Sequence, residues 1–67
     1  MTRWTGIVPT HDDFDSLIVD EFVDGRTKSG PWAIMTVGNH AQYGIGLGTG
    51  KGQRYKKKGN EWVKVEG

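Results

Sequence analysis

The sequence predicts a small, mainly β domain built from antiparallel hairpins with one short helical element, and an α+β arrangement is the alternative. Three observations support this prediction. The chain has 67 residues and no cysteine, so it forms one small core without a disulfide. Short runs rich in Val, Ile, Trp and Phe are separated by glycine, proline and asparagine, which is typical of strands joined by turns. Glycine also occupies every second position from Gly44 to Gly52, and two is the period of a β-strand.

We expect a single domain over residues 1–67, in which residues 1–9 form an extended arm and residues 10–67 form the core. Pro9 ends the arm because it has no N–H group to donate to a strand ladder. Trp4 is expected in the core or at its edge. The alternative is an exposed indole that serves as a stacking platform.

Residues 10–24 support two interpretations. The first is a helical turn over residues 10–16 followed by a strand over residues 17–24, because Val, Ile and Phe are enriched in the second half. The alternative is a single helix over residues 11–23. Thr10 would cap that helix, and its apolar residues recur at helical spacing.

The next segment reads as a loop, a strand and a helical turn. The Asp-Gly pair at 24–25 and the polar residues after it predict a loop between two strands. Pro31 then precedes a strand over residues 32–36. The Gly-Asn pair at 38–39 ends this strand, and residues 40–43 are expected to form a helical turn.

The alternating glycines predict a strand over residues 44–52 that has no side chains on one face. A bare face lets a large flat side chain approach closely, and Trp62 is the candidate. The alternative is that the glycines adopt positive φ and present N–H groups to an anion. A phosphate-binding P-loop is excluded, because Ile45 stands at the required glycine and Gly52 follows Lys51. The glycine spacing also fails the dinucleotide-binding fingerprint.

The end of the chain predicts a hairpin. Residues 53–58 and 61–65 flank a two-residue Gly-Asn turn at 59–60. The expected core draws on the apolar residues of the predicted strands: Trp32, Ile34, Leu47, Trp62, Val63 and some of Ile18, Phe22 and Val65.

Charge is distributed unevenly along the chain, although the net charge is only +1. Residues 1–30 carry three basic and six acidic side chains, whereas residues 31–67 carry six basic and two acidic ones. Basic side chains next to an aromatic ring are typical of nucleic-acid binders, which attract phosphates and stack bases. The alternative is a solvated hairpin tip whose lysines prevent aggregation between strand edges. The candidate nucleic-acid-binding residues are Lys51, Arg54, Tyr55, Lys56, Lys57 and Lys58.

The sequence contains no recognisable catalytic or metal-binding motif. The acidic residues after His11 do not match a calcium loop, because Leu17 and Ile18 stand where a ligand and a glycine are required. His40 has no carboxylate or cysteine nearby in the sequence, and no serine or threonine lies in a nucleophile motif. We therefore expect no catalytic residue, no metal, no cofactor and no enzyme activity.

Three stretches of the sequence form a recognisable pattern: DGRT at 24–27, GPWA at 30–33 with Met35, and GIGLGTGKGQ at 44–53 with Tyr55. In this pattern the chain resembles a group of small uncharacterised proteins encoded by bacteriophages and prophages, over roughly residues 18–66. Many of those proteins read Cys-x-x-Cys after Trp-Ala-x-Met, like half of a zinc ribbon, whereas this chain has Thr36 and Asn39. The resemblance implies a zinc-ribbon-like hairpin scaffold without zinc.

These observations predict a non-catalytic phage accessory module that binds nucleic acid through a basic, glycine-rich hairpin. The alternative is a protein-interaction module that modulates or inhibits a host bacterial protein. No apolar run approaches the roughly 18 residues of a membrane helix, so no membrane partner is expected. The expected location is the cytoplasm of the host cell.

Overall fold

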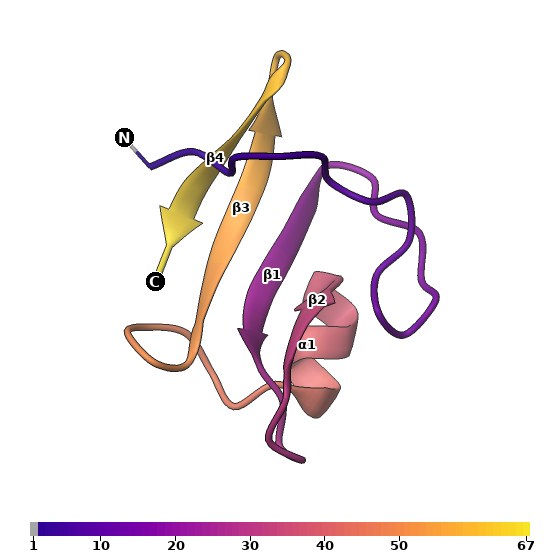
Figure 1. Ribbon diagram of the computed structural model, residues 1–67, viewed down its shortest axis with the longest axis vertical. Helices are drawn as coiled ribbons and strands as arrows, with labels where there is room; N and C mark the ends of the chain where they lie inside the picture. Colours follow the sequence, from indigo (N-terminus) through magenta and orange to yellow (C-terminus); the bar gives the residue numbers. More distant parts are fainter. Residues whose placement is uncertain (1) are drawn as a thin grey trace.

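Four strands and one short helix make up residues 2–67, the part of the chain that the computed structural model describes (Figure 1). The strands form one antiparallel sheet in the order β2-β1-β3-β4. The prediction of a small, mainly β domain with antiparallel hairpins and one short helical element is confirmed. In chain order the elements are β1 (Glu21–Arg26), β2 (Trp32–Met35), α1 (Val37–Tyr43), β3 (Gly52–Lys58) and β4 (Glu61–Glu66).

Helix α1 begins at a capping threonine and ends at a glycine. The hydroxyl oxygen of Thr36 accepts a hydrogen bond from the backbone N–H of Asn39 at 3.2 Å, which satisfies one of the donors at the helix start. At the other end the N–H of Gly44 donates to the carbonyl of His40 at 2.8 Å. The Gly-Asn pair at 38–39 does not end the strand as predicted: β2 ends at Met35, and the pair lies inside the helix, which begins at Val37, about one turn before the predicted start at residue 40.

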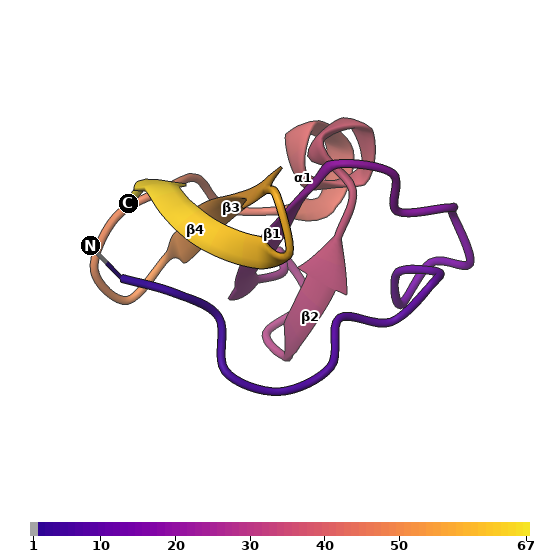
Figure 2. The same cartoon turned by 90° about the horizontal axis from the view of Figure 1, so that it is seen from above.

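The sheet has two faces, and each buries a different set of side chains. Phe22 in β1 pairs with Tyr55 in β3, and both rings are buried on the face that the start of the chain covers. Val23 is the next residue and points to the opposite face, where it pairs with Met35. Both of these side chains are buried on the side of the sheet where α1 lies (Figure 2).

An aromatic cluster forms the centre of the first face. The indole of Trp4 meets Phe22 and Tyr55 edge-on, with ring centroids 5.2 and 5.3 Å away. Phe22 stacks on Tyr55 at 5.3 Å and also contacts Trp62 at 5.3 Å. Such aromatic pairs stabilise a fold by more than the burial of their apolar surface alone. The expectation that Trp4 lies in or at the edge of the core is confirmed.

Residues 2–20, here called the N-terminal segment, cover both edges of the sheet. At the outer edge of β4, the N–H of Trp4 donates to the carbonyl of Trp62 at 2.8 Å. At the outer edge of β2, the N–H of Asp13 donates to the carbonyl of Ile34 at 2.9 Å, and its carboxylate accepts from the N–H of Ile34 at 2.7 Å. Exposed strand edges invite pairing with other chains, so this segment protects the sheet from aggregation.

The buried carboxylate of Asp12 clamps the N-terminal segment to the start of α1. One of its oxygens accepts hydrogen bonds from the N–H groups of Phe14 and Ser16, at 2.9 and 2.8 Å. The other accepts from the N–H of Thr36 and the side-chain amide of Asn39, both at 2.7 Å. Burial by itself raises the pKa of Asp12, but the four hydrogen bonds outweigh it and lower the pKa from 3.8 to about 2.

Residues 10–20 differ from both predictions made for them. They form a turn and a loop closed by an isolated bridge between His11 and Leu17, and β1 starts only at Glu21. The single helix over residues 11–23 is therefore wrong, and so is the strand start at residue 17. The Asp12 clamp accounts for the missing helix, because it binds the N–H groups of Phe14 and Ser16 that a helix would bond to carbonyls one turn earlier.

The Asp-Gly pair at 24–25 lies in the middle of a strand and not in a loop as predicted. Gly25 is directly opposite Gly52, and a Cβ atom on Gly25 would lie 2.9 Å from the carbonyl oxygen of Lys51. The two backbones approach so closely that only glycine fits. Strand β1 therefore continues to Arg26.

The predicted glycine strand over residues 44–52 is wrong. Residues 44–51, here called the glycine loop, connect α1 to β3 and contain three glycines with positive φ: Gly46 at 124°, Gly48 at 122° and Gly50 at 76°. Positive φ is incompatible with an extended strand, and glycine adopts it without steric cost. The indole of Trp62 packs on Phe22 and does not cover a bare strand face.

The C-terminal hairpin is confirmed, with β3 and β4 joined by the Gly-Asn turn at 59–60. The predicted core is correct only in part. Ile18, Phe22 and Val63 are buried, but Trp32 is 45% exposed at the start of the edge strand β2. Leu47 is half-buried and Val65 is exposed. Three buried side chains were not expected in the core: Val23, Met35 and Tyr55.

We expect Asp12→Asn to lower the free energy of unfolding by about 2–3 kcal/mol at neutral pH, because the pKa falls from 3.8 to about 2 on folding. The folded-state pKa lies below the unfolded one. This stabilisation is therefore complete above about pH 4 and is lost as the pH falls through about 2. Urea unfolding of both proteins at neutral and acidic pH measures the difference. Asp15→Asn is the control, because Asp15 is exposed and its φ of 65° suits asparagine. An equal loss of unfolding free energy in Asp12→Asn and Asp15→Asn would contradict the stabilising role assigned to the Asp12 carboxylate.

Replacing two tryptophans separates the core from the surface. Trp4→Ala should cost about 3–5 kcal/mol, comparable to the whole stability of so small a domain, because its indole packs on the aromatic cluster. Trp32→Ala should cost about 1 kcal/mol, since that ring is 45% exposed. Urea unfolding followed by circular dichroism checks both values. A larger loss of unfolding free energy in Trp32→Ala than in Trp4→Ala would contradict the placing of Trp4 in the core and Trp32 at the surface.

Candidate functional site

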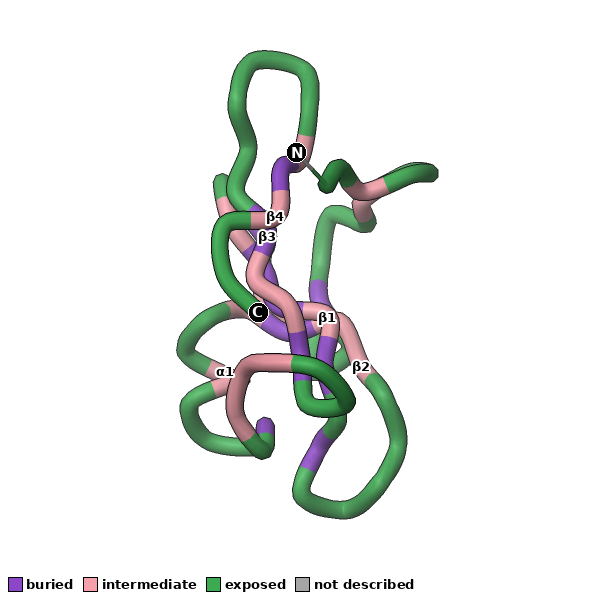
Figure 3. The backbone as a smooth tube through the Cα atoms, turned by 90° about the vertical axis from the view of Figure 1, so that its left-hand side faces the viewer, coloured by how far each residue is buried: buried purple, intermediate pink, exposed green. Residues whose placement is uncertain are grey.

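Residues 2–67 enclose no pocket, and most of their charged side chains lie on the exposed surface. The most strongly charged part of this surface is the end of the β3–β4 hairpin, residues 56–60, here called the lysine tip. Lys56, Lys57 and Lys58 are all exposed, and the turn at Gly59 has a φ of 63°. Figure 3 shows the exposed hairpin end beyond the buried middle of the strands.

The carboxylates close to the lysine tip are engaged by arginines. Glu61 forms an ion pair with the Nε of Arg3 at 2.6 Å, and Glu21, which pairs with Lys56 across the sheet, is bound by Arg54. Asp20 accepts a backbone hydrogen bond from Lys57 at 2.8 Å, but forms no ion pair with it. Within residues 2–67 the three lysines of the tip make no ion pair, so their charge is available to a ligand.

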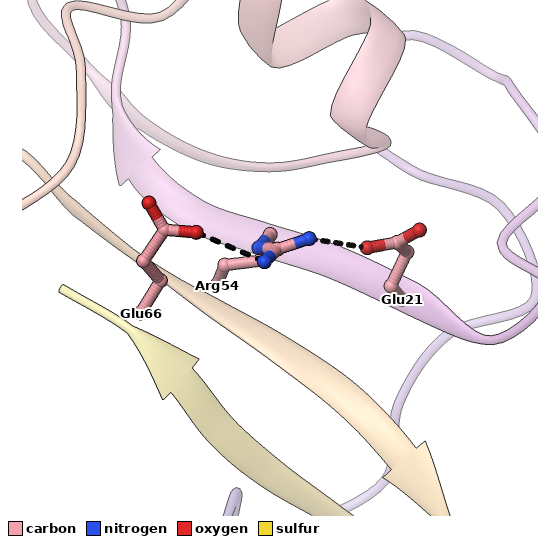
Figure 4. A network of polar contacts seen from close by, with 3 residues as sticks. All are labelled: Glu21, Arg54 and Glu66. Atoms are coloured by element: carbon pink, nitrogen blue, oxygen red, sulfur yellow. Dashed lines mark hydrogen bonds and ion pairs between the residues drawn. The ribbon is translucent and has the colours of Figure 1, made fainter.

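Arg54 lies in the middle of β3 and is held by two carboxylates (Figure 4). Its Nη1 lies 2.9 Å from an oxygen of Glu21, and its Nη2 lies 2.9 Å from an oxygen of Glu66. These contacts join β1, β3 and β4 across one face of the sheet. The structure therefore gives Arg54 a part in holding the strands together and separates it from the lysine tip.

Tyr55 offers no ring face to a base. Its ring is 8% exposed, stacks on Phe22 and meets the edge of Trp4. Burial, and then the negative charge of Asp24, raise the pKa of the Tyr55 hydroxyl above its ordinary value. Tyr55 is thus a core residue and not a binding residue as predicted. It contributes to the lysine tip only by stabilising β3.

Lys51 lies at the opposite end of the sheet from the lysine tip, in the glycine loop (Figure 1). Lys57, the middle lysine of the tip, lies six residues further along β3, and at about 3.3 Å per residue this is a distance of roughly 20 Å. Its carbonyl accepts a hydrogen bond from the N–H of Arg26 at 2.8 Å, so Arg26 and the nearby Lys28 lie at the same end of the sheet. The six residues predicted as one site therefore form four separate groups: the three lysines of the tip, the ion-paired Arg54, the core residue Tyr55 and the distant Lys51.

The glycine loop is fixed from both sides. The Nε2 of His40 lies 2.9 Å from the carbonyl oxygen of Gly46, and Gly48 and Gly52 exchange backbone hydrogen bonds at 2.8 and 3.0 Å. The side-chain amide of Gln53 also lies 3.4 Å from the carbonyl of Gly48. His40 is thus part of the loop anchor, a role that the sequence analysis did not propose.

The two positions at which the resembling phage proteins carry cysteines are occupied by hydrogen-bonding groups. Thr36 caps α1, and the side-chain amide of Asn39 donates to Asp12 and to Ser16, at 2.7 and 2.9 Å. Neither side chain supplies a thiolate, so these residues do not fit a zinc ion. Within residues 2–67 no three His, Asp or Glu side chains are placed to hold a metal ion.

A second surface feature was not identified from the sequence. Four large apolar side chains of the N-terminal segment are exposed to solvent: the aromatic Phe14 at 40%, and the aliphatic Ile7 at 93%, Leu17 at 57% and Val19 at 71%. Asp15 and Asp20, which flank Leu17 and Val19 in the sequence, are also exposed. The sequence pattern predicts an extended arm around Ile7 and a helix or a strand around Leu17 and Val19, and neither prediction indicates an exposed apolar surface.

No helix within residues 2–67 has the length and the apolar character that crossing a membrane requires. Comparison of the chain with protein-family models, with curated proteins and with solved structures gave no match. What this chain does must therefore be inferred from its own residues.

We expect Arg54→Gln to lower the free energy of unfolding by about 1–3 kcal/mol, because the partly buried carboxylate of Glu21 and the exposed carboxylate of Glu66 lose their charged partner. Lys57→Gln is the matched control in the same strand and should change it by less than about 0.5 kcal/mol, since Lys57 is exposed. Thermal unfolding at low and high salt measures both. A stability loss in Lys57→Gln as large as that in Arg54→Gln would contradict the assigned role.

Proposed function

We propose that this chain is a non-catalytic accessory module that binds nucleic acid through the lysine tip. A single observation supports this: Lys56, Lys57 and Lys58 are consecutive, exposed and without a carboxylate partner, although acidic side chains lie close by. Ordinary surface lysines are interspersed with carboxylates, and three unpaired ones at a projecting hairpin end form a local positive charge. The resemblance to small phage-encoded proteins is compatible with an accessory role in an infected cell.

The proposed binding is electrostatic. Lysine ammonium groups neutralise phosphates and release the counterions condensed around them, so affinity falls as the salt concentration rises. Three lysines neutralise about three phosphates and give a slope of about −3 in a plot of log K against log salt. With a net charge of +1 on the whole chain, the affinity should be modest.

The exposed apolar residues of the N-terminal segment support a second candidate function, a protein-interaction module. Ile7, Leu17 and Val19 are exposed and take no part in the core cluster, and Asp15 and Asp20 lie close to Leu17 and Val19 in the sequence. Exposed apolar side chains in a charged surround are typical of protein interfaces. A host protein with a basic rim around an apolar surface would complement them.

Replacing Lys56, Lys57 and Lys58 by glutamine should weaken binding to a fluorescently labelled oligonucleotide at least tenfold at low salt, because the phosphate contacts are lost. Fluorescence anisotropy measures the affinity, and circular dichroism confirms that the variant still folds. The control replaces Arg26, Lys28 and Lys51, which removes the same charge at the opposite end of the sheet.

The control variant should bind nearly as well as the parent protein, because a distance of roughly 20 Å exceeds the Debye length of about 10 Å at 0.1 M salt. If both variants lose affinity equally, the binding depends on net charge and not on the lysine tip. If the parent protein does not bind any oligonucleotide at low salt, the proposed function is excluded. Capture of a stoichiometric host protein that resists nuclease and salt would then favour the second candidate.

A further inference from the structure

We infer that the nucleic acid bound by the lysine tip is duplex DNA, and that the end of the β3–β4 hairpin enters its major groove. This inference rests on the function proposed above and specifies its ligand. It follows from three features of the hairpin: where its aromatic rings lie, how far it extends beyond the sheet, and to which faces its lysines point.

The aromatic rings of the hairpin are committed to the core. Tyr55 is 8% exposed between Phe22 and Trp4, and Trp62 packs against Phe22 with ring centroids 5.3 Å apart. Proteins that bind single strands obtain much of their affinity by stacking bases on exposed rings. The lysine tip carries no ring of its own. The nearest ring is that of Trp62 opposite Lys57, which is partly buried and packs on Phe22, so the tip itself contacts phosphates.

The exposed aromatic residues lie elsewhere. Trp32 is in β2, at the far edge of the sheet from β4, and Phe14 and Tyr43 stack on each other at 4.6 Å beside the end of α1. A single strand held at the lysine tip could not stack on them without crossing the sheet. Single-stranded DNA therefore gains nothing over a duplex in aromatic contacts.

The hairpin end extends beyond the rest of the sheet as a two-stranded ribbon. The ladder between β1 and β3 ends at the pair formed by Glu21 and Lys56, and the N–H of Lys57 still donates to the carbonyl of Asp20, whereas β3 and β4 remain paired up to Lys58 and Glu61. Two strands lie about 4.8 Å apart, and the major groove of B-form DNA is about 12 Å wide and admits such a ribbon. The major groove of A-form RNA is too narrow and deep for side chains to enter.

The three lysines point to both faces of this ribbon. Side chains alternate along a strand, so Lys56 and Lys58 project from one face and Lys57 from the other. Inside a groove the two faces meet the two phosphate backbones that form its walls. A single strand has only one backbone and can satisfy only one face.

The test uses the full chain and three probes of one sequence: a DNA duplex of about 16 base pairs, more than one helical turn, its single strand, and the matching RNA duplex. Fluorescence anisotropy at low salt should show the DNA duplex bound at least tenfold more tightly than either other probe. Replacing all three lysines by glutamine should abolish this preference. Replacing Arg26, Lys28 and Lys51 should preserve it.

Each other outcome has one meaning. If the single strand binds as tightly as the DNA duplex, or quenches tryptophan fluorescence on binding, the duplex inference is overturned while the proposed function stands. If the RNA duplex binds as tightly as the DNA duplex, insertion into the major groove is overturned. If no probe binds, the proposed function itself fails.

Discussion

The packing of Trp4 against Phe22 and Tyr55 is the interaction on which the rest of the structure depends. Four short strands cannot enclose a core by themselves, and one face of the sheet would be open without a cover. The indole supplies that cover, with ring centroids 5.2 and 5.3 Å from its two partners. Because it lies at the start of the chain, it also brings the whole N-terminal segment across the sheet. The same segment then protects both sheet edges and supplies the Asp12 clamp.

This packing also decides what the surface can offer to a ligand. Because Tyr55 is needed in the aromatic cluster, the basic strand β3 points its one ring inwards. Arg54 is drawn into ion pairs with Glu21 and Glu66, which hold three strands together. What remains for a partner is the charge of the lysine tip. The function proposed for the protein is thus set as much by the residues that the fold withdraws from the surface as by those it exposes.

The glycine-rich stretch has a structural role that differs from the one its spacing indicates. Alternation by two predicts a strand, but three of these glycines adopt positive φ, which turns the chain from the end of α1 back to β3. The close contact between Gly25 and Gly52 lets the loop lie against β1. A period of two is therefore shared by strands and by loops in which every second residue has a left-handed conformation. In this chain only the tertiary contacts that His40 and Arg26 make with residues 44–51 distinguish a loop from a strand.

The sequence alone determined the fold class, the C-terminal hairpin with its Gly-Asn turn, the strand at residues 32–35 and the helical turn after it, because these depend on local propensity and turn chemistry. It also located the three lysines of the tip, since consecutive charges are exposed in any small fold. The tertiary structure decided the start of β1, the path of the glycine loop, the burial of Tyr55 and the pairing of Arg54. Each of these depends on contacts between residues far apart in the chain. Asp12 meets Thr36, Gly25 meets Gly52, and the edge of Trp4 meets Tyr55. A local sequence pattern contains no information about such long-range contacts. For this reason the six candidate binding residues, predicted as one site, lie in four places: the lysine tip, the core, an ion pair and the distant glycine loop.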